Sequence, residues 1–139
     1  SGGTITTTGT LSLSGSYTGT WAVTGGITAT QNIIAYYSDD RLKNRLENIQ
    51  NPLEKVRTLS GFYYIPNEVA QELGYEVKRE VGVSAQQVQN VLPEVVVPAP
   101  IDNKYLTVQY ERFAPLFIEA LKELRAEVKE LKAKLANGA

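Results

Sequence analysis

Two chemically different halves of the chain meet at Tyr36-Tyr37-Ser38-Asp39-Asp40-Arg41-Leu42-Lys43. No charged side chain precedes Asp39, and all the acidic and basic residues follow from that position onward. Because so abrupt a change in composition is typical of a domain boundary, we expect residues 1–37 and residues 38–139 to form different domains. The same stretch holds Ser38 and Lys43 in a chain that has no His and no Cys. If covalent chemistry occurs in this protein, we expect it at this junction.

The composition of the whole chain excludes several classes of function. A length of 139 residues and a net charge of -1 leave room for one modest core and argue against binding to nucleic acid or an anionic membrane. Without His and Cys, the usual metal ligands and the usual general base are missing, so we expect no metal and no cofactor. No apolar run approaches the ~20 residues that cross a bilayer, and we expect a soluble chain. The chain does not begin with Met and reads as a fragment of a longer protein.

The uncharged half shows a repeat of two residues, which is typical of strands with one buried face. Apolar and Gly residues occupy the odd positions from Ile5 to Ala29 except at Thr7, and Thr and Ser fill most of the even positions. Such a segment buries too little apolar surface to offset roughly 1–2 kcal/mol of backbone entropy per residue by itself. We therefore expect a parallel homotrimer that resembles a β-prism or a triple β-helix. The alternative is a disordered linker rich in Thr, Ser and Gly.

The charged half alternates helical and extended patterns. Residues 39–59 read as a helix with a break near Pro52, and residues 84–91 read as a short amphipathic helix. Strands are expected at residues 62–65, 94–97 and 105–110, with Pro66 and Pro98 ending the first two. The signal between residues 67 and 79 is weak, and Gly74 suggests a hairpin or a loop there.

The C-terminal segment carries a heptad repeat. Leu121, Val128 and Leu135 fall at position a, while Phe117, Leu124 and Leu131 fall at position d. We expect a parallel coiled coil over about residues 112–136, with an amphipathic helix on its own domain as the alternative. The heptad does not separate two strands from three, but the stem argues for three. The sequence thus predicts an α+β fold: a trimeric stem, then a mixed α/β domain that ends in a long coiled-coil helix.

Ser38 and Lys43 have two interpretations from their positions alone. A Ser before an Asp-rich helix start is commonly an N-cap. On a regular helix, five residues correspond to about 140° of rotation, so Ser38 and Lys43 would not share a face. The two side chains can meet only if Ser38 lies in the preceding extended segment and Lys43 turns back.

Four ordered motifs, which extend from the junction into the C-terminal helix, resemble the intramolecular chaperone domain of phage endosialidases and of related tail fibres and tail spikes. The resemblance spans about residues 36–135. The motifs are the junction followed by Leu53-Glu54-Lys55-Val56 and Gly61-Phe62-Tyr63-Tyr64; Gly82-Val83-Ser84-Ala85-Gln86-Gln87-Val88 with Val91-Leu92-Pro93-Glu94-Val95-Val96; Tyr105-Leu106-Thr107-Val108-Gln109-Tyr110; and Leu116-Phe117-Ile118-Glu119-Ala120-Leu121-Lys122-Glu123-Leu124. Ser84 stands where an aliphatic residue is common in that family.

The resemblance implies a homotrimer that guides its own β-rich stem into register and then cuts itself off. Ser38 would be the nucleophile, Lys43 the base, and the bond between Tyr37 and Ser38 the cleavage site. Asp39 and Arg41 would be structural supports, and Gln86 would pack in the core or support the site. Lys43 can accept a proton only as a neutral amine, which burial or nearby cations such as Arg41 and Arg45 would favour.

The resemblance also implies a place in the phage virion, as part of a tail fibre or spike that would be assembled in the host cytoplasm. The chaperone part would be shed after cleavage. Two other functions are left open by the residues themselves. One is a trimerisation and folding cap that stays at the fibre tip without cutting, with Ser38 as an N-cap. The other is a receptor-binding tip whose exposed aromatic side chains contact glycans.

Overall fold

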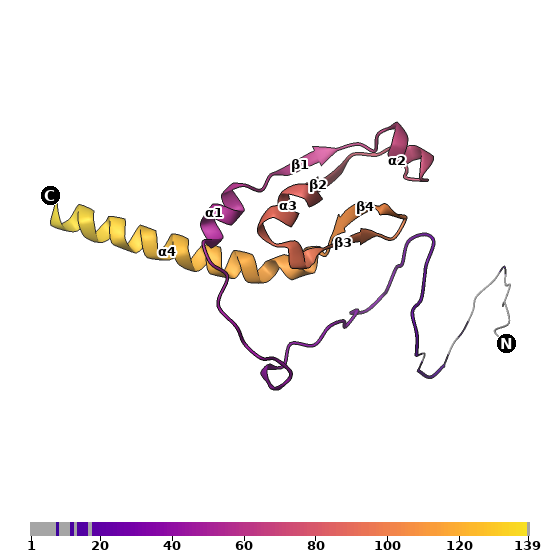
Figure 1. Cartoon of the computed structure of the whole chain (residues 1–139), viewed down its shortest axis with the longest axis horizontal. Coiled ribbons are helices and arrows are strands. Elements are labelled where there is room, and N and C mark those ends of the chain that lie inside the picture. The colour runs from indigo at the N-terminus through magenta and orange to yellow at the C-terminus, as the bar shows by residue number, and fades with distance from the viewer. Residues whose placement is uncertain (1–7, 9–11, 13, 17, 139) are drawn as a thin grey trace. The chain divides into compact units, whose positions relative to one another are not determined.

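The computed structural model describes residue 8, residue 12, residues 14–16 and residues 18–138. The chain divides by its internal contacts into two units, with the boundary between Lys43 and Asn44. Figure 1 follows the chain from indigo at its N-terminus to yellow at its C-terminus. Over the described part of the first unit the only regular element is a 3-10 turn, η1 (Asp40–Leu42). All the described side chains before Ile49 are exposed. The trimeric β-stem needs other chains to bury its apolar face, and part of it lies outside the described residues, so it stays a prediction.

The helix expected over residues 39–59 is wrong as far as Asn51. After η1 the backbone has no regular structure through Ile49, and the first α-helix, α1 (Pro52–Arg57), begins at the residue expected to break it. Leu42 and Leu46 are exposed, and within residues 42–49 only Ile49 packs against the core, so most of the apolar repeat has no cover to stabilise a helix. Pro suits the first position of a helix because the N–H that it lacks would have no partner there.

The expected strand at residues 62–65 is confirmed as β1 (Gly61–Tyr64), which pairs antiparallel with β2 (Glu80–Val83). A short helix, α2 (Glu68–Glu72), lies between the two strands in the chain. Neither β2 nor α2 was predicted. Asn67 caps α2 by accepting a hydrogen bond from Ala70 N at 3.0 Å. Gly74 follows with a φ of 99°, which only Gly adopts without cost.

The expected helix near residues 84–91 is confirmed as α3 (Ala85–Val91), with Ser84 as its N-cap. A 3-10 turn, η2 (Pro93–Val95), then leads into β3 (Val96–Ala99), which pairs antiparallel with β4 (Asp102–Val108). β3 starts later than expected because the turn takes up Pro93–Val95. It also runs through Pro98, which was expected to end it. In a two-stranded sheet each strand is an edge, where a residue without an N–H is tolerated.

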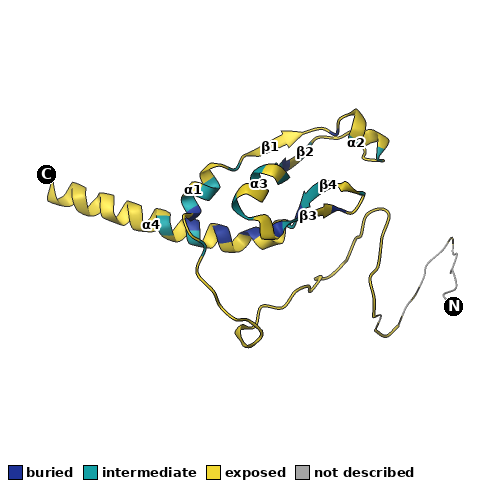
Figure 2. Cartoon of the chain, in the orientation of Figure 1, coloured by how far each residue is buried: buried dark blue, intermediate teal, exposed yellow. Residues whose placement is uncertain are grey.

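The core lies where α3, the β3–β4 sheet and the start of the last helix meet. That helix is α4 (Ala114–Asn137), preceded by the 3-10 turn η3 (Tyr110–Phe113). Helix α1 packs beside α4, where Leu53 N donates to Glu123 Oε2 at 3.0 Å. Figure 2 shows the buried residues along the first turns of α4. The core cluster consists of Val88, Val95, Val108, Phe113 and Leu116.

The predicted C-terminal helix is present as α4, and its two ends differ in burial. Leu116 is fully buried, whereas every residue from Leu124 to Asn137 is exposed, as the yellow end of α4 in Figure 2 shows. The exposed part includes heptad positions Leu124, Val128 and Leu131. A coiled coil requires further copies of the chain, so it stays a prediction. Among the described residues, none of the helices is both long and apolar enough to pass through a bilayer.

Candidate functional site

Ser38 and Lys43 lie within hydrogen-bonding distance of each other. Lys43 Nζ is 3.1 Å from Ser38 Oγ and 3.0 Å from the carbonyl oxygen of the same residue. Ser38 precedes η1, and Lys43 follows it in an extended conformation, with φ -127° and ψ 132°. The lysine side chain therefore turns back across the 3-10 turn. This is the arrangement that the two residues need if they are to meet.

Asp39, and not Ser38, is the N-cap of this turn. Its Oδ1 accepts a hydrogen bond from Arg41 N at 2.8 Å. The expectation that Ser38 caps the helix is therefore wrong for this structure, and its hydroxyl is left to face Lys43. Asp and Ser are equally good caps, so two adjacent candidates could not be ranked from sequence.

Asp39 and Arg41 form a two-pronged ion pair. Arg41 Nε lies 3.0 Å from Asp39 Oδ1, and Arg41 Nη2 lies 2.8 Å from Asp39 Oδ2. The Arg41 side chain, followed by the Arg41 backbone N–H, lowers the pKa of Asp39, while a weaker attraction to Lys43 acts in the same direction. The pairing with Asp39 raises the pKa of Arg41. The positive charge of Arg41 is thus paired with the Asp39 carboxylate and is not directed at Lys43.

The backbone before the candidate cleavage site is unusual. Tyr36 has a φ of 65°, in the left-handed region that bulky residues seldom adopt. Such a conformation costs of the order of 1 kcal/mol and persists where the surroundings impose it. It lies one residue before Tyr37, whose carbonyl carbon would be attacked by the Ser38 hydroxyl. Tyr36 therefore marks local backbone strain one residue before the candidate cleavage site.

Both members of the pair are open to solvent in the single chain. Ser38 and Lys43 are exposed, as are Tyr36 and Tyr37. The second cation proposed to act on Lys43 is Arg45, whose Nη2 donates to Asn48 Oδ1 at 3.0 Å. A buried environment for the amine would therefore have to come from other copies of the chain.

Gln86 does not pack in the core. It is exposed on α3 and accepts from Ser84 Oγ at 3.3 Å, so the expectation of core packing is wrong. The core face of α3 is formed by Val88, and Gln87 instead reaches across to accept from Ser60 N at 3.1 Å. A supporting role for Gln86 at the site stays a prediction.

Gly82 belongs to the same motif and fills a tight place beside two tyrosines. A Cβ added to it would lie 3.0 Å from the hydroxyl oxygen of Tyr110 and 3.2 Å from the ring of Tyr64. The Tyr110 hydroxyl accepts a hydrogen bond from Val83 N at 3.2 Å. This contact attaches β2 to η3, and the pattern of glycine and tyrosine in the sequence did not reveal it.

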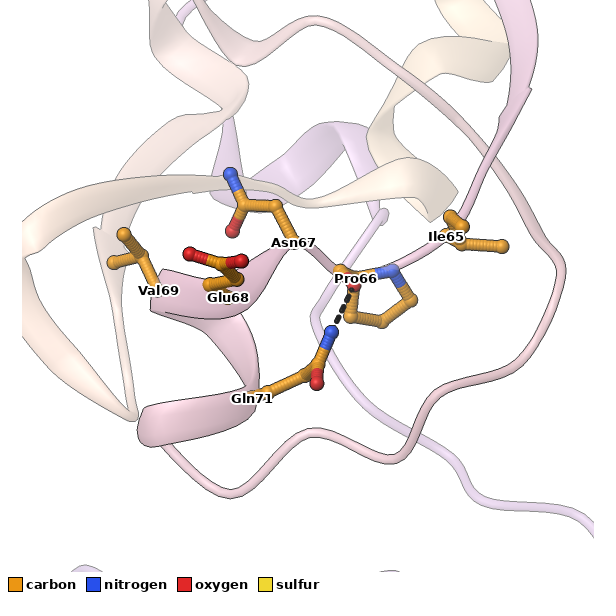
Figure 3. A pocket seen from close by; sticks show the side chains of 6 residues that line it. All are labelled: Ile65, Pro66, Asn67, Glu68, Val69 and Gln71. Atoms are coloured by element: carbon orange, nitrogen blue, oxygen red, sulfur yellow. Dashed lines mark hydrogen bonds between the residues drawn. The ribbon is translucent and has the colours of Figure 1, made fainter.

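A shallow pocket lies at the start of α2, outside the Ser38 site (Figure 3). It is open to solvent and is lined by Ile65, Pro66, Asn67, Glu68, Val69 and Gln71. Gln71 Nε2 donates to Pro66 O at 2.9 Å, and Asn67 is occupied in capping α2, so two polar groups of the pocket already have partners. In the described part of the chain, acidic residues do not gather into a cluster that could hold a metal ion.

Known proteins resemble this chain over the domain described above. Residues 38–97 match the family model described as the chaperone of endosialidase, and the match begins at Ser38. The chain is 43% identical over 101 residues to the long tail fiber protein Gp37 of Enterobacteria phage K3, a match that covers 70% of this chain and 8% of that protein. The Gp37 protein of Enterobacteria phage T2 is equally similar, at 43% over 101 residues, with 70% of this chain and 7% of the relative covered.

A shorter relative gives the same result. The chain is 35% identical over 106 residues to the Gp37 protein of Enterobacteria phage M1, which covers 75% of this chain and 42% of that protein. The chain therefore spans less than half the length of each of these relatives. The motifs, their order and the matched residues agree on one conclusion: residues 38–97 are similar to the chaperone-of-endosialidase family, and the longer matches are to phage tail fibre proteins.

Proposed function

We propose that this chain is the end of a phage tail fibre that assembles as a homotrimer, guides its own β-stem into register and then cuts itself between Tyr37 and Ser38. The observation that carries the proposal is the 3.1 Å approach of Lys43 Nζ to Ser38 Oγ, at the residue where the family match begins. The family is named as a peptidase and as a chaperone, which supports both parts of this role. The tail fibre relatives support a place in the phage virion. Assembly in the host cytoplasm is part of the proposal.

The proposed cleavage is an acyl shift followed by hydrolysis. Ser38 Oγ attacks the carbonyl carbon of Tyr37 while its proton passes to the neutral amine of Lys43. The C–N bond between Tyr37 and Ser38 then breaks, and Lys43 returns the proton to the departing Ser38 nitrogen. An ester now joins the Tyr37 carbonyl to Ser38 Oγ. Water hydrolyses it to a Tyr37 carboxylate and restores the Ser38 hydroxyl, so the reaction needs water and no cofactor.

Assembly would supply what the single chain lacks at this site. A lysine amine donates to the serine oxygen while it is protonated, and it can take the serine proton only after it loses its own charge. Burial disfavours the charged form of an amine. Ser38 and Lys43 are exposed in one chain, so we infer that neighbouring copies cover them in the trimer. Cleavage would then follow correct assembly and would not precede it.

The exposed half of α4 supports the trimer. From Leu124 onward about four helical turns have no cover, although their apolar residues keep the heptad spacing. A helix of that length is marginal in water unless an apolar face is buried. Packing three copies along positions a and d would bury this face and hold three stem segments together at high effective concentration. Once the domain is shed, the stem would lose its route to unfolding and become kinetically stable.

Two variants test the chemistry. After refolding, electrophoresis under denaturing conditions should show two fragments for the natural sequence and one intact chain for Ser38→Ala and Lys43→Met. Native mass spectrometry should show that both variants still assemble, because the heptad residues of α4 are unchanged in them. Cleavage that persists in either variant would contradict the proposed roles.

A second candidate is a cap that trimerises the fibre and stays attached. The exposure of both Ser38 and Lys43 favours it, because the single chain gives the pair no enclosed site for the reaction. In that case the natural sequence would assemble, give a single intact band and hold it on prolonged incubation.

A further inference from the structure

The path of the chain between Ser38 and Lys43 consists of a single 3-10 turn. Leu42 N donates to Asp39 O at 3.1 Å, and Lys43 N donates to Asp40 O at 3.2 Å. The turn ends at once, because Lys43 is already extended. If the helix continued as an α-helix, Lys43 would lie about 140° around the axis from position 38 and would point away from it. The approach of the two side chains therefore depends on a turn that is short and that ends at Lys43.

Asp39 supplies the side-chain bonds that define the start of this turn. Its Oδ1 accepts from Arg41 N at 2.8 Å, which satisfies a backbone donor that the turn itself leaves unpaired. Arg41 in turn grips both carboxylate oxygens of Asp39 and holds that side chain in the capping orientation. These contacts lie within three consecutive residues, so the turn can form before the copies assemble.

The ion pair of Asp39 with Arg41 engages both carboxylate oxygens, and both side chains remain exposed. An exposed ion pair adds little to the free energy of folding, so stabilising the fold does not by itself explain why Asp39 and Arg41 pair.

We propose that Asp39 is a positioning residue for self-cleavage: by capping the 3-10 turn it brings Lys43 Nζ back to Ser38 Oγ, and Arg41 keeps it in the capping orientation. The inference rests on the proposed function, because it assigns Asp39 a part in that reaction. Asp39 itself takes no proton and forms no bond to the reacting atoms.

The first test compares Asp39→Ala with the matched variant Asp39→Asn. Asn keeps an oxygen that can accept from Arg41 N, and Ala does not. The first-order rate at which the fragments appear after refolding should fall at least about tenfold in Asp39→Ala and stay within about threefold of the natural rate in Asp39→Asn. Native mass spectrometry should show the same oligomer for all three proteins. An unchanged rate in Asp39→Ala, or an equal loss in both variants, would overturn the inference.

The second test does not depend on cleavage. In the uncleavable Ser38→Ala background, a nuclear Overhauser contact between the β-methyl at position 38 and the Lys43 ε-methylene reports whether the two side chains meet. The contact should be present in Ser38→Ala, persist when Asp39→Asn is added and disappear when Asp39→Ala is added. Its absence from Ser38→Ala, or its survival with Asp39→Ala, would refute the positioning role. If the contacts behave as expected but the natural chain never cuts, the self-cleavage proposal fails and the positioning of Lys43 by Asp39 stands.

Discussion

The junction at residues 36–43 and the packed domain at residues 44–138 hold their geometry by different means. In the domain, apolar side chains from α3, β4 and α4 bury one another, with Val88 and Leu116 fully removed from solvent. In the junction, all side chains are exposed, and the bonds that shape it join residues two to five positions apart, Asp39 to Arg41 and Ser38 to Lys43. The domain is thus formed by long-range packing, whereas the junction is arranged locally and still lacks cover.

The largest effect is expected from substitutions in the exposed end of α4, which would supply the cover that the junction lacks in a single chain. A double substitution, Leu124→Lys with Leu131→Lys, places two charges at position d of the heptad. If α4 forms the trimer that covers the junction, the two charges should raise the dissociation constant of the trimer at least about a hundredfold, because burying an unpaired charge is costly. Light scattering and helix content by circular dichroism measure this. Ala126→Lys, at the outer position f, is the control and should leave the trimer unchanged. A monomeric natural chain at micromolar concentration would contradict the coiled coil altogether.

A matched pair of leucines measures the difference in packing directly. Leu116→Ala should lower the free energy of unfolding by about 3 kcal/mol, because it leaves a cavity in the core. Leu42→Ala, in the exposed junction, should change it by no more than about 0.5 kcal/mol. Urea denaturation at fixed protein concentration gives both values. Equal losses would show that the junction is as tightly packed as the domain.

The sequence predicts most of the helices and strands of the packed domain, but it predicts little of the conformation of residues 39–51, which lead into that domain. The heptad in α4 and the amphipathic pattern of residues 84–91 are local signals, and both of these predicted helices were found. The helix expected at residues 39–51 was wrong because Leu42 and Leu46 have nothing to cover on this chain, which a periodic pattern does not reveal. Strand β2 was missed because Tyr110, 27 positions from Val83, helps to hold it.

The candidate site was identified from residue types, and its geometry was left open. Ser38 and Lys43 were singled out by sequence and by resemblance, but the spacing alone did not bring them together. The 3-10 turn that does so depends on whether Ser38 or Asp39 becomes the cap, and the two have nearly equal propensity. The contacts of Arg41 with Asp39 decide between these two caps, and they are seen only in the three-dimensional structure.

Within the domain, removing the hydrogen bond between Tyr110 and β2 should lower the free energy of unfolding by a smaller amount. Tyr110→Phe should cost about 1 kcal/mol of unfolding free energy, because Val83 N loses its acceptor. Hydrogen exchange should be faster at the Val83 amide while the amides of α3 keep their protection. Uniform loss of protection would mean that β1 and β2 unfold only with the core, and that this contact is no separate attachment.

The smallest expected effect concerns the acid response of the junction. Asp39 has its pKa lowered from 3.8 mainly by the Arg41 side chain, so its contribution is fully present above the unfolded value and is lost as the pH falls through the folded value. The local turn should therefore hold above about pH 4 and loosen below it. A carboxyl titration by nuclear magnetic resonance should place Asp39 below 3.8 in the natural chain and move it upward in Arg41→Gln. An unchanged titration in Arg41→Gln would mean that the ion pair does not form in solution.

The most direct test of self-cleavage at the junction is the intact mass of the natural protein after refolding, followed over time. We predict two products that together account for the whole chain plus one water, with one ending at Tyr37 and the other beginning at Ser38. The second should be absent when Ser38→Ala is treated in the same way. A single mass that stays equal to the full chain in a properly assembled trimer would contradict self-cleavage and leave the attached cap as the function.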